Sequence, residues 1–306
     1  MRIVRAAYGR LPAHRLARRA PRFRVRLSLA PAIARAAGRQ EPAAVRALSA
    51  DGILCGAMGA ASFVSLSPHA RSALIVVGRD TLRHAYHVRY ELLEFAVYVL
   101  AARAQGLVPL HAACLGQGNA GLLLLGASGA GKSTLMLQAL LGGLELLAED
   151  SVLVKPQGLR ATGLASYLHL RPDALRFLTR GERRLLMARA APIRRRSGVR
   201  KLEIDVRGAG YRLAAAPLAI RALVFLSARP RRGSEPLLRR LPSAQLLSRL
   251  ARHQRYATQQ PGWAAFRRRL ARLSGYELRR GSHPQEAVEE LRALLSGPTR
   301  RARAAP

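Results

Sequence analysis

Acidic residues and lysines are both scarce in this chain. Of its 306 residues only 17 are Asp or Glu, whereas 52 are Lys or Arg, so the formal net charge is +35. Only three of those 52 are lysines: Lys132, Lys155 and Lys201. Such an excess of positive charge is typical of proteins that bind nucleic acid or anionic membranes. The arginines are scattered along the whole chain, however, and we interpret the excess as a compositional bias, as in proteins encoded by GC-rich DNA.

Cysteine and aromatic residues are also few. The two cysteines, Cys55 and Cys114, lie in apolar stretches, and neither belongs to a CxxC pair or a Cys/His cluster. This excludes a disulfide framework and the common zinc sites, and we expect both residues to be buried. Aromatic residues make up 5% of the chain. Because no nucleic-acid-binding or helicase-type motif is present either, we do not expect a nucleic-acid partner.

Long hydrophobic runs are missing as well. The longest apolar helix candidate, "FAVYVLAARAQGLV", is cut by Arg103 and follows Glu91 and Glu94, so it is too short and too charged for a bilayer. The basic N-terminal stretch lacks a continuous apolar segment, and we expect no secretory signal. Since 49% of the residues are hydrophobic, we expect a globular, cytoplasmic protein without a membrane partner.

The pattern of strands and helices divides the chain into three parts. We predict a smaller β-rich region over residues 1–85, a core over 86–241 and a mainly helical segment over 242–306. The predicted strands are 61–67, 72–78, 107–116, 121–126, 144–154, 218–230 and 275–281, and the predicted helices are 86–106, 132–143 and 284–295. The order strand–loop–helix–strand in the middle of the core indicates an α/β fold with parallel strands.

A phosphate-binding motif lies within that core. The stretch "GASGAGKST" has the pattern G-x-x-x-x-G-K-S, with four leucines before it and an amphipathic helix after it. Glycines let backbone N–H groups approach phosphates, and the N-terminus of the following helix favours an anion. Lys132 can reach the β- and γ-phosphates, and the Ser133 hydroxyl can bind Mg²⁺. The predicted nucleotide-binding residues are Gly126, Ala127, Ser128, Gly129, Ala130, Gly131, Lys132, Ser133 and Thr134.

An acidic pair, Glu149 and Asp150, follows the next strand. In a right-handed β–α–β crossover the two strands run parallel, so their carboxyl ends lie at the edge of the sheet where ligands bind. We therefore expect both carboxylates to reach the phosphate end of a nucleotide. One could hold Mg²⁺ and the other could accept a proton from an attacking hydroxyl. His111, on the strand before the loop, could act there too, although a lone His on an apolar strand is also typical of a hydrogen-bonded core residue.

The combination "LHAAC…GLLLLGASGAGKST…GLELLAEDSVLV" resembles the HPr kinase/phosphorylase family, especially its HPr-related kinases. The family shares its P-loop core with phosphoenolpyruvate carboxykinase. The resemblance therefore implies an α/β fold with an HPr kinase/PEP carboxykinase-like P-loop core, beside the β-rich N-terminal region and the helical C-terminal segment. It is strong over residues 107–155 and weaker over 89–96, 167–178 and 194–204.

The resemblance also implies roles for individual residues. Glu149 takes the position of the family's catalytic Asp, the general base, and Asp150 that of the second, metal-associated Asp. The predicted catalytic residues are Glu149, His111 and Lys132, and the predicted metal ligands are Ser133, Asp150 and Glu203. This sequence departs from the family in having Glu at the first acidic position and in reading "LEIDVRG" where the family has "LEIRG".

The predicted activity is that of an ATP- and Mg²⁺-dependent HPr kinase-like serine kinase, which transfers a γ-phosphoryl group to a Ser hydroxyl of a protein or peptide. Family members often assemble, so the resemblance is compatible with a homo-oligomer. Two alternatives stay open: an ATP-binding or ATPase module that is regulatory or nucleic-acid-stimulated, and a kinase for a small molecule. The basic residues at 194–201 could contact phosphates or an acidic peptide, or could form a solvated loop.

Overall fold

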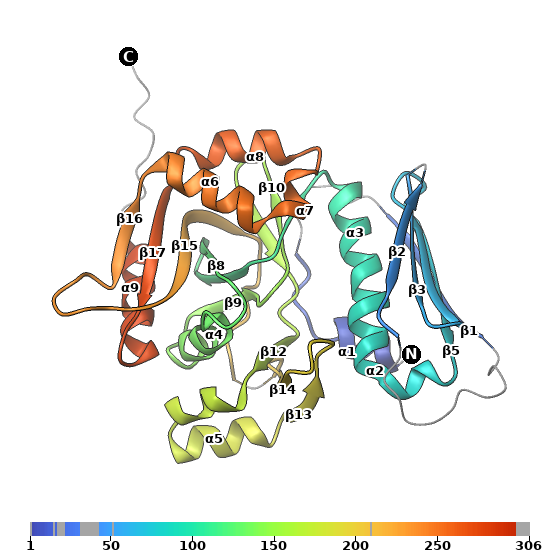
Figure 1. The fold of residues 1–306 in the computed structure, drawn as a ribbon, viewed down its shortest axis with the longest axis horizontal. Helices are drawn as coiled ribbons and strands as arrows, with labels where there is room; N and C mark the ends of the chain where they lie inside the picture. The colour runs from blue at the N-terminus through green and yellow to red at the C-terminus, as the bar shows by residue number, and fades with distance from the viewer. Residues whose placement is uncertain are drawn as a thin grey trace. The chain divides into compact units, whose positions relative to one another are not determined.

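The computed structural model describes residues 2–14, 16, 22–30, 43–50, 52–208 and 210–297 (Figure 1). It is a mixed α/β fold, as predicted, and its backbone contacts divide it into two compact units. The first unit comprises Met1–Gly9, Ala17–Leu107 and Arg196–Gly198, and the second comprises Arg10–Leu16, Val108–Arg195 and Val199–Pro306. Residues 86–107 thus belong with the N-terminal strands, whereas the sequence placed them in the core; the three-part division itself stays a prediction.

The first unit is an antiparallel-rich sheet with helices on one face. The sheet order is β1-β5-β4-β3-β2, in which only the β1–β5 pair is parallel. The elements are α1 (Arg2–Tyr8), β1 (Arg24–Ala30), β2 (Arg46–Ala50), β3 (Ile53–Met58), β4 (Ser62–Ser67), β5 (Ser72–Gly78), the 3-10 helix η1 (Thr81–His84), α2 (Ala85–His87), the π-helix η2 (Val88–Glu94) and α3 (Phe95–Ala104).

Buried and exposed side chains alternate along the strands of this sheet, because helices cover one of its two faces. On β4, Val64 and Leu66 are buried and pack in one cluster with Leu92 and Leu100 of the helices, while Phe63 points the other way and is exposed. The expected burial of Cys55 is wrong for the same reason, because it lies on the uncovered face of β3, where its thiol faces the Ser65 hydroxyl. Cys114, in the second unit, is buried as expected.

The second unit is built on a nine-stranded mixed sheet. Its order is β6-β10-β11-β15-β8-β7-β9, with β17 pairing with β15 and β16 with β17. The strands of the unit are β6 (Val108–Leu110), β7 (Ala113–Gln117), β8 (Ala120–Leu125), β9 (Glu145–Ala148), β10 (Val152–Lys155), β11 (Arg160–Gly163), β12 (Tyr167–Leu170), β13 (Ala190–Arg194), β14 (Arg200–Asp205), β15 (Leu218–Pro230), β16 (Leu238–Leu241) and β17 (Ser274–Arg280). The strands predicted over 107–116 and 144–154 are therefore each split in two.

Helices cover both faces of this sheet (Figure 1). One hydrophobic cluster joins α4 and α9 to one face, and a second joins α6, α7 and α8 to the other. A separate three-stranded antiparallel sheet, in the order β12-β14-β13, adjoins α4. The helices are α4 (Lys132–Leu141), the 3-10 helix η3 (Pro172–Phe177), α5 (Arg180–Met187), α6 (Ser243–His253), α7 (Arg255–Thr258), α8 (Trp263–Leu270) and α9 (Pro284–Ser296). Within the described ranges no helix has the length and apolarity needed to cross a membrane.

Candidate functional site

The phosphate-binding motif forms a strand, a tight loop and a helix, as the sequence predicts. Every residue of β8 is buried, residues 126–131 form the loop, and Lys132, Ser133 and Thr134 make the first turn of α4. Gly129 and Gly131 have φ of +84° and +92°, values that residues with a Cβ adopt only with strain. A Cβ on Gly126 would lie 3.2 Å from the Cβ atoms of both Ala130 and Leu226. The left-handed backbone therefore favours glycine at residue 129 and at motif position 131, and there is little room for a side chain at motif position 126.

The sheet topology brings the acidic pair to this loop. Strand β7 pairs antiparallel with both β8 and β9, so β8 and β9 run parallel to each other, as expected, with β7 between them. The carboxyl ends of β8 and β9 and the amino end of β7 consequently lie at one edge of the sheet, which we call the P-loop edge. Glu149 and Asp150 follow β9 there, and His111 lies two residues before β7.

Glu149 is buried and has both carboxylate oxygens engaged. Its Oε1 accepts a hydrogen bond from the Ser133 hydroxyl at 2.6 Å, and its Oε2 lies 2.9 Å from Nδ1 of His169. The other ring nitrogen, Nε2, lies 3.1 Å from Oε1 of Glu203. Glu149 and His169 are only 5% and 6% exposed. Burial alone would lower the pKa of His169, but the hydrogen bonds to the two carboxylates outweigh it and raise the pKa above its usual 6.5.

Asp150 makes a different set of contacts. Its Oδ1 lies 3.3 Å from Nζ of Lys132 and 3.5 Å from Nδ1 of His111. The side chain is 25% exposed. Burial would raise the pKa of Asp150, but the charges of Lys132 and His111 outweigh it and hold the pKa below its usual 3.8. Asp150 is therefore a partly exposed carboxylate beside the lysine of the loop, and the lowered pKa favours its ionised form.

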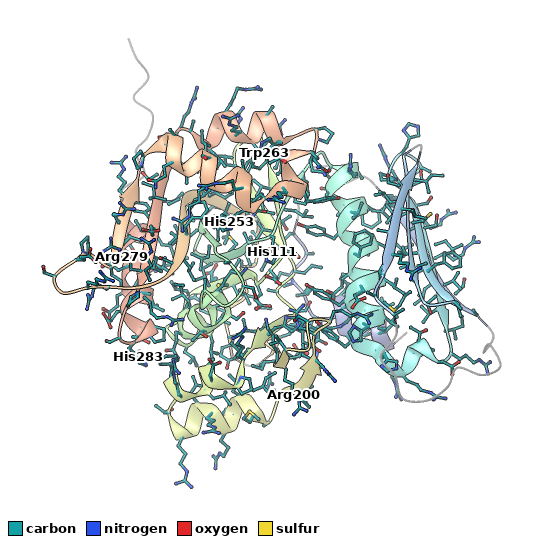
Figure 2. All side chains as sticks on the ribbon, viewed as in Figure 1. His111, Arg200, His253, Trp263, Arg279 and His283 are labelled. Carbon is teal, nitrogen blue, oxygen red and sulfur yellow. The ribbon has the colours of Figure 1, made fainter. Side chains whose placement is uncertain are left out.

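Gln254 fixes the position of His111, a role that no sequence pattern indicates. The His111 backbone N–H donates to Oε1 of Gln254 at 2.8 Å, and the Gln254 Nε2 donates to the His111 carbonyl at 2.9 Å. Gln254 is 5% exposed and lies between α6 and α7. Between the end of β6 and the start of β7, the side-chain amide of Gln254 thus makes the two hydrogen bonds that a neighbouring strand would otherwise make. The His111 side chain, labelled in Figure 2, stays 63% exposed at the P-loop edge.

The acidic turn also depends on Gly163 of β11. A Cβ on Gly163 would lie 2.5 Å from the Cβ of Ala148 and 3.0 Å from the carbonyl oxygen of Ser151. These are the residues that flank Glu149 and Asp150. Close approach of β11 to this turn is therefore possible only because residue 163 has no side chain.

Cations on and next to the three-stranded sheet interact electrostatically with the acidic pair. The charges of Arg195, Glu149, Asp150 and Arg171 all act on Lys201. Burial and then the neighbouring Arg195 lower the pKa of Lys201 below its usual 10.5. The sequence of the basic residues at 194–201 is compatible with contacts to phosphates or an acidic peptide and also with a solvated loop. At Lys201, which is half-buried on β14, the structure places the side chain within the electrostatic reach of the site.

The predicted metal ligands are not brought to one point. Ser133 meets Glu149, Asp150 contacts Lys132 and His111, and Glu203 contacts His169. In the part of the chain that the structure describes, no three His, Cys, Asp or Glu side chains gather so as to hold a metal ion. The oxygen pair of Ser133 and Glu149 is the arrangement that suits a hard divalent cation, which prefers hydroxyl and carboxylate ligands and keeps several waters.

Fold and site together define a mixed α/β protein with a strand–loop–helix phosphate motif and a carboxylate pair at one sheet edge. No protein-family model matches this sequence, and no curated protein matches it. Among solved structures, the chain is similar to the Hpr(Ser) kinase/phosphatase from Coxiella burnetii, at 16% identity and a TM-score of 0.32. The match covers 60% of this chain and 93% of that chain. At so low a TM-score the likeness decides neither fold family nor activity, and the family resemblance stays a prediction.

Proposed function

We propose that this chain is an HPr kinase-like phosphotransferase that uses ATP and Mg²⁺ to phosphorylate a Ser hydroxyl of a protein or peptide. The observation that carries the proposal is the convergence at the P-loop edge. The lysine and the serine of the loop each contact one member of the acidic pair, Lys132 with Asp150 and Ser133 with Glu149. Phosphoryl transfer needs this combination of phosphate cradle, cation, metal-binding oxygens and proton acceptor in one place.

The loop and α4 would bind the nucleotide phosphates. Backbone N–H groups of residues 126–131 and of the first turn of α4 supply donors, and the helix N-terminus supplies a favourable potential. Lys132, at the first position of α4, adds a positive charge within reach of the β- and γ-phosphates. These groups neutralise charge that moves onto the leaving diphosphate during transfer.

Ser133 and Glu149 fit the role of Mg²⁺ ligands. In the structure the serine hydroxyl donates to the glutamate, which is the arrangement expected of two groups that can share a cation. His169 holds the far oxygen of Glu149 and Glu203 holds His169, so both act through Glu149. When bound, Mg²⁺ would supply charge neutralisation at the phosphates.

Asp150 is the better candidate for the proton acceptor than Glu149, to which the sequence assigned that role. Glu149 is buried with both oxygens bonded, whereas Asp150 is partly exposed next to Lys132 and His111. The acceptor hydroxyl oxygen would attack the γ-phosphorus, and the bond from that phosphorus to the bridging oxygen would break with its electron pair passing to ADP. The hydroxyl proton would pass to Asp150. Lys132 would then share its charge with the phosphates, which favours proton uptake by Asp150.

A matched pair of variants tests these roles. Asp150→Asn should keep Mg²⁺-dependent ATP binding and lose transfer, because the amide accepts no proton. Glu149→Gln should raise the Mg²⁺ concentration needed for ATP binding, because it removes a charged ligand. Glu289→Gln, on the exposed side of α9, is the control and should change neither. Full transfer by Asp150→Asn together with its loss in Glu149→Gln at saturating Mg²⁺ would restore the original assignment.

The acceptor is found by labelling. Incubation with γ-labelled ATP, a cell lysate and the products of neighbouring genes should yield a protein or peptide that carries phosphoserine. Release of labelled phosphate into water without any labelled acceptor would identify an ATPase instead. A labelled small molecule would identify a small-molecule kinase, and release that rises with added DNA or RNA would identify a nucleic-acid-stimulated ATPase.

A further inference from the structure

One face of the three-stranded sheet carries both the buried network of the site and a group of cations. His169 on β12 pairs directly with Glu203 on β14, so their side chains share a face. Lys201 lies two residues before Glu203 on the same strand and therefore on the same face. Continuing the antiparallel register one step past Leu170 sets Arg171 opposite Lys201. The two cations thus lie one row beyond the histidine that holds Glu149.

Arg171 is directed at the phosphate-binding loop. A Cβ on Gly129 would lie 4.0 Å from Nη2 of Arg171, so the guanidinium lies beside this loop residue, whose backbone is left-handed. The segment that carries Arg171 is held against α4. Ala174 and Leu175 of η3 are buried in the same cluster as α4, and the Gln138 side chain donates to the Phe177 carbonyl at 3.2 Å. Arg171 is therefore an exposed cation on a fixed support.

Lys201 interacts electrostatically with both this arginine and the acidic pair. Its side chain is half-buried and is influenced by the positive charge of Arg171 and by the negative charges of Glu149 and Asp150. Lysine is rare in this chain, and one of its three lysines is Lys132 of the loop itself. Besides Lys132 of the loop, the three-stranded sheet therefore supplies two further cations near the loop and the acidic pair, Arg171 beside Gly129 and Lys201 opposite Arg171 in the register.

We propose that Arg171 and Lys201 form a second cationic subsite, outside the P-loop, that binds the terminal phosphate of the nucleotide. This inference rests on the proposed function, because it deepens the same site. A terminal phosphate carries more charge than the phosphates inside the chain, and guanidinium and ammonium donors make charge-assisted hydrogen bonds to its oxygens. The subsite would let the protein distinguish ATP from ADP. It would also stay in contact with the γ-phosphoryl group while that group is transferred to the acceptor.

Nucleotide binding by four variants tests the subsite. Arg171→Ala and Lys201→Ala should each weaken ATP binding on the order of 10- to 100-fold, the effect of losing a charge-assisted hydrogen bond, and should change ADP binding by less than about 2-fold. Arg171→Lys should keep part of the preference for ATP. Arg200→Ala is the matched control. Arg200 is the neighbour of Lys201 on β14, and its exposed side chain lies on the opposite face of that strand (Figure 2). The affinities are measured by calorimetry with Mg²⁺, on proteins whose far-ultraviolet circular dichroism matches the wild type.

The outcomes separate this inference from the proposed function. If the wild type binds neither nucleotide, the proposed function fails. If Lys132→Ala loses binding of both nucleotides while Arg171→Ala and Lys201→Ala leave the ATP-to-ADP preference unchanged, the second subsite is refuted and the P-loop assignment stands. Equal affinity of the wild type for ATP and ADP refutes the subsite as well. A 10-fold or larger loss confined to ATP supports it.

Discussion

Replacing His169 by alanine should destabilise the second unit in a way that depends on pH. His169 is almost completely buried between Glu149 and Glu203, with ring-nitrogen to carboxylate distances of 2.9 and 3.1 Å. Removing it leaves the buried carboxylate of Glu149 and the mostly buried carboxylate of Glu203, whose side chain is 12% exposed, without the cation that they share. Breaking a buried charged pair by deleting one partner costs about 3–5 kcal/mol. That is a large part of the stability of about 5–15 kcal/mol that a protein usually has.

The pH dependence follows from the direction of the pKa shift. Because the folded-state pKa of His169 is raised above its unfolded value, the charge-dependent part of its stabilisation is complete below that unfolded value. It is lost as the pH rises through the folded-state pKa. The difference in unfolding free energy between wild type and His169→Ala should therefore be largest near pH ~6 and smaller near pH ~10.

Trp263 provides a selective assay. It is the only tryptophan of the chain, and it lies on α8 in the second unit, against Phe266 (Figure 2). Its fluorescence during urea unfolding, in the absence of nucleotide and divalent metal, reports on the unit that contains His169. His253→Ala, an exposed histidine of the same unit, is the control and should cost less than about 1 kcal/mol. A His169→Ala protein within about 1 kcal/mol of wild type at pH ~6 would refute the charged bridge.

Three further substitutions probe the P-loop edge. Lys132→Ala should lower transfer from γ-labelled ATP on the order of 10²–10³-fold by removing a preorganised charge, and near-normal turnover would exclude the P-loop assignment. Gln254→Ala should lower the unfolding temperature and slow transfer with little change in the KM for ATP, because it frees the backbone of His111; an unchanged rate would refute the positioning role of Gln254. Gly163→Ala should cost about 1–3 kcal/mol in urea unfolding and abolish transfer by displacing the acidic turn, whereas Gly181→Ala, whose Cβ meets nothing within 4 Å, should do neither.

Local patterns in the sequence were sufficient to predict the strand, loop and helix at the centre of the candidate site. The glycines and the lysine of the loop lie within eight residues of one another, and the strand before it and the helix after it are long, regular apolar patterns. The parallel direction of β8 and β9 also followed, because a helix joins them by a crossover. These features depend on chain neighbours, which a sequence displays directly.

Features that depend on contacts between distant parts of the chain could not be predicted from the sequence. The expected single strand over 107–116 is broken at His111, where the partner is the side chain of Gln254 and not another strand. Arg171 looks like one more arginine among many until η3 packs on α4 and sets it beside Gly129. The exchange of roles that we propose for the acidic pair has the same origin, because the burial of Glu149 depends on His169, which lies on a different sheet.

The position of β15 has a consequence for synthesis of the chain. Strand β8, which leads into the P-loop, ends at Leu125 and pairs on one side with β15, which begins only at Leu218. At a translation rate of about 5–20 residues per second, β8 and its run of leucines must wait roughly 5–20 s for that partner to leave the ribosome. During this interval one edge of the leucine strand has no native partner and is open to wrong pairing. We therefore expect the yield of folded protein to respond to chaperones and to the speed of translation between residues 125 and 218.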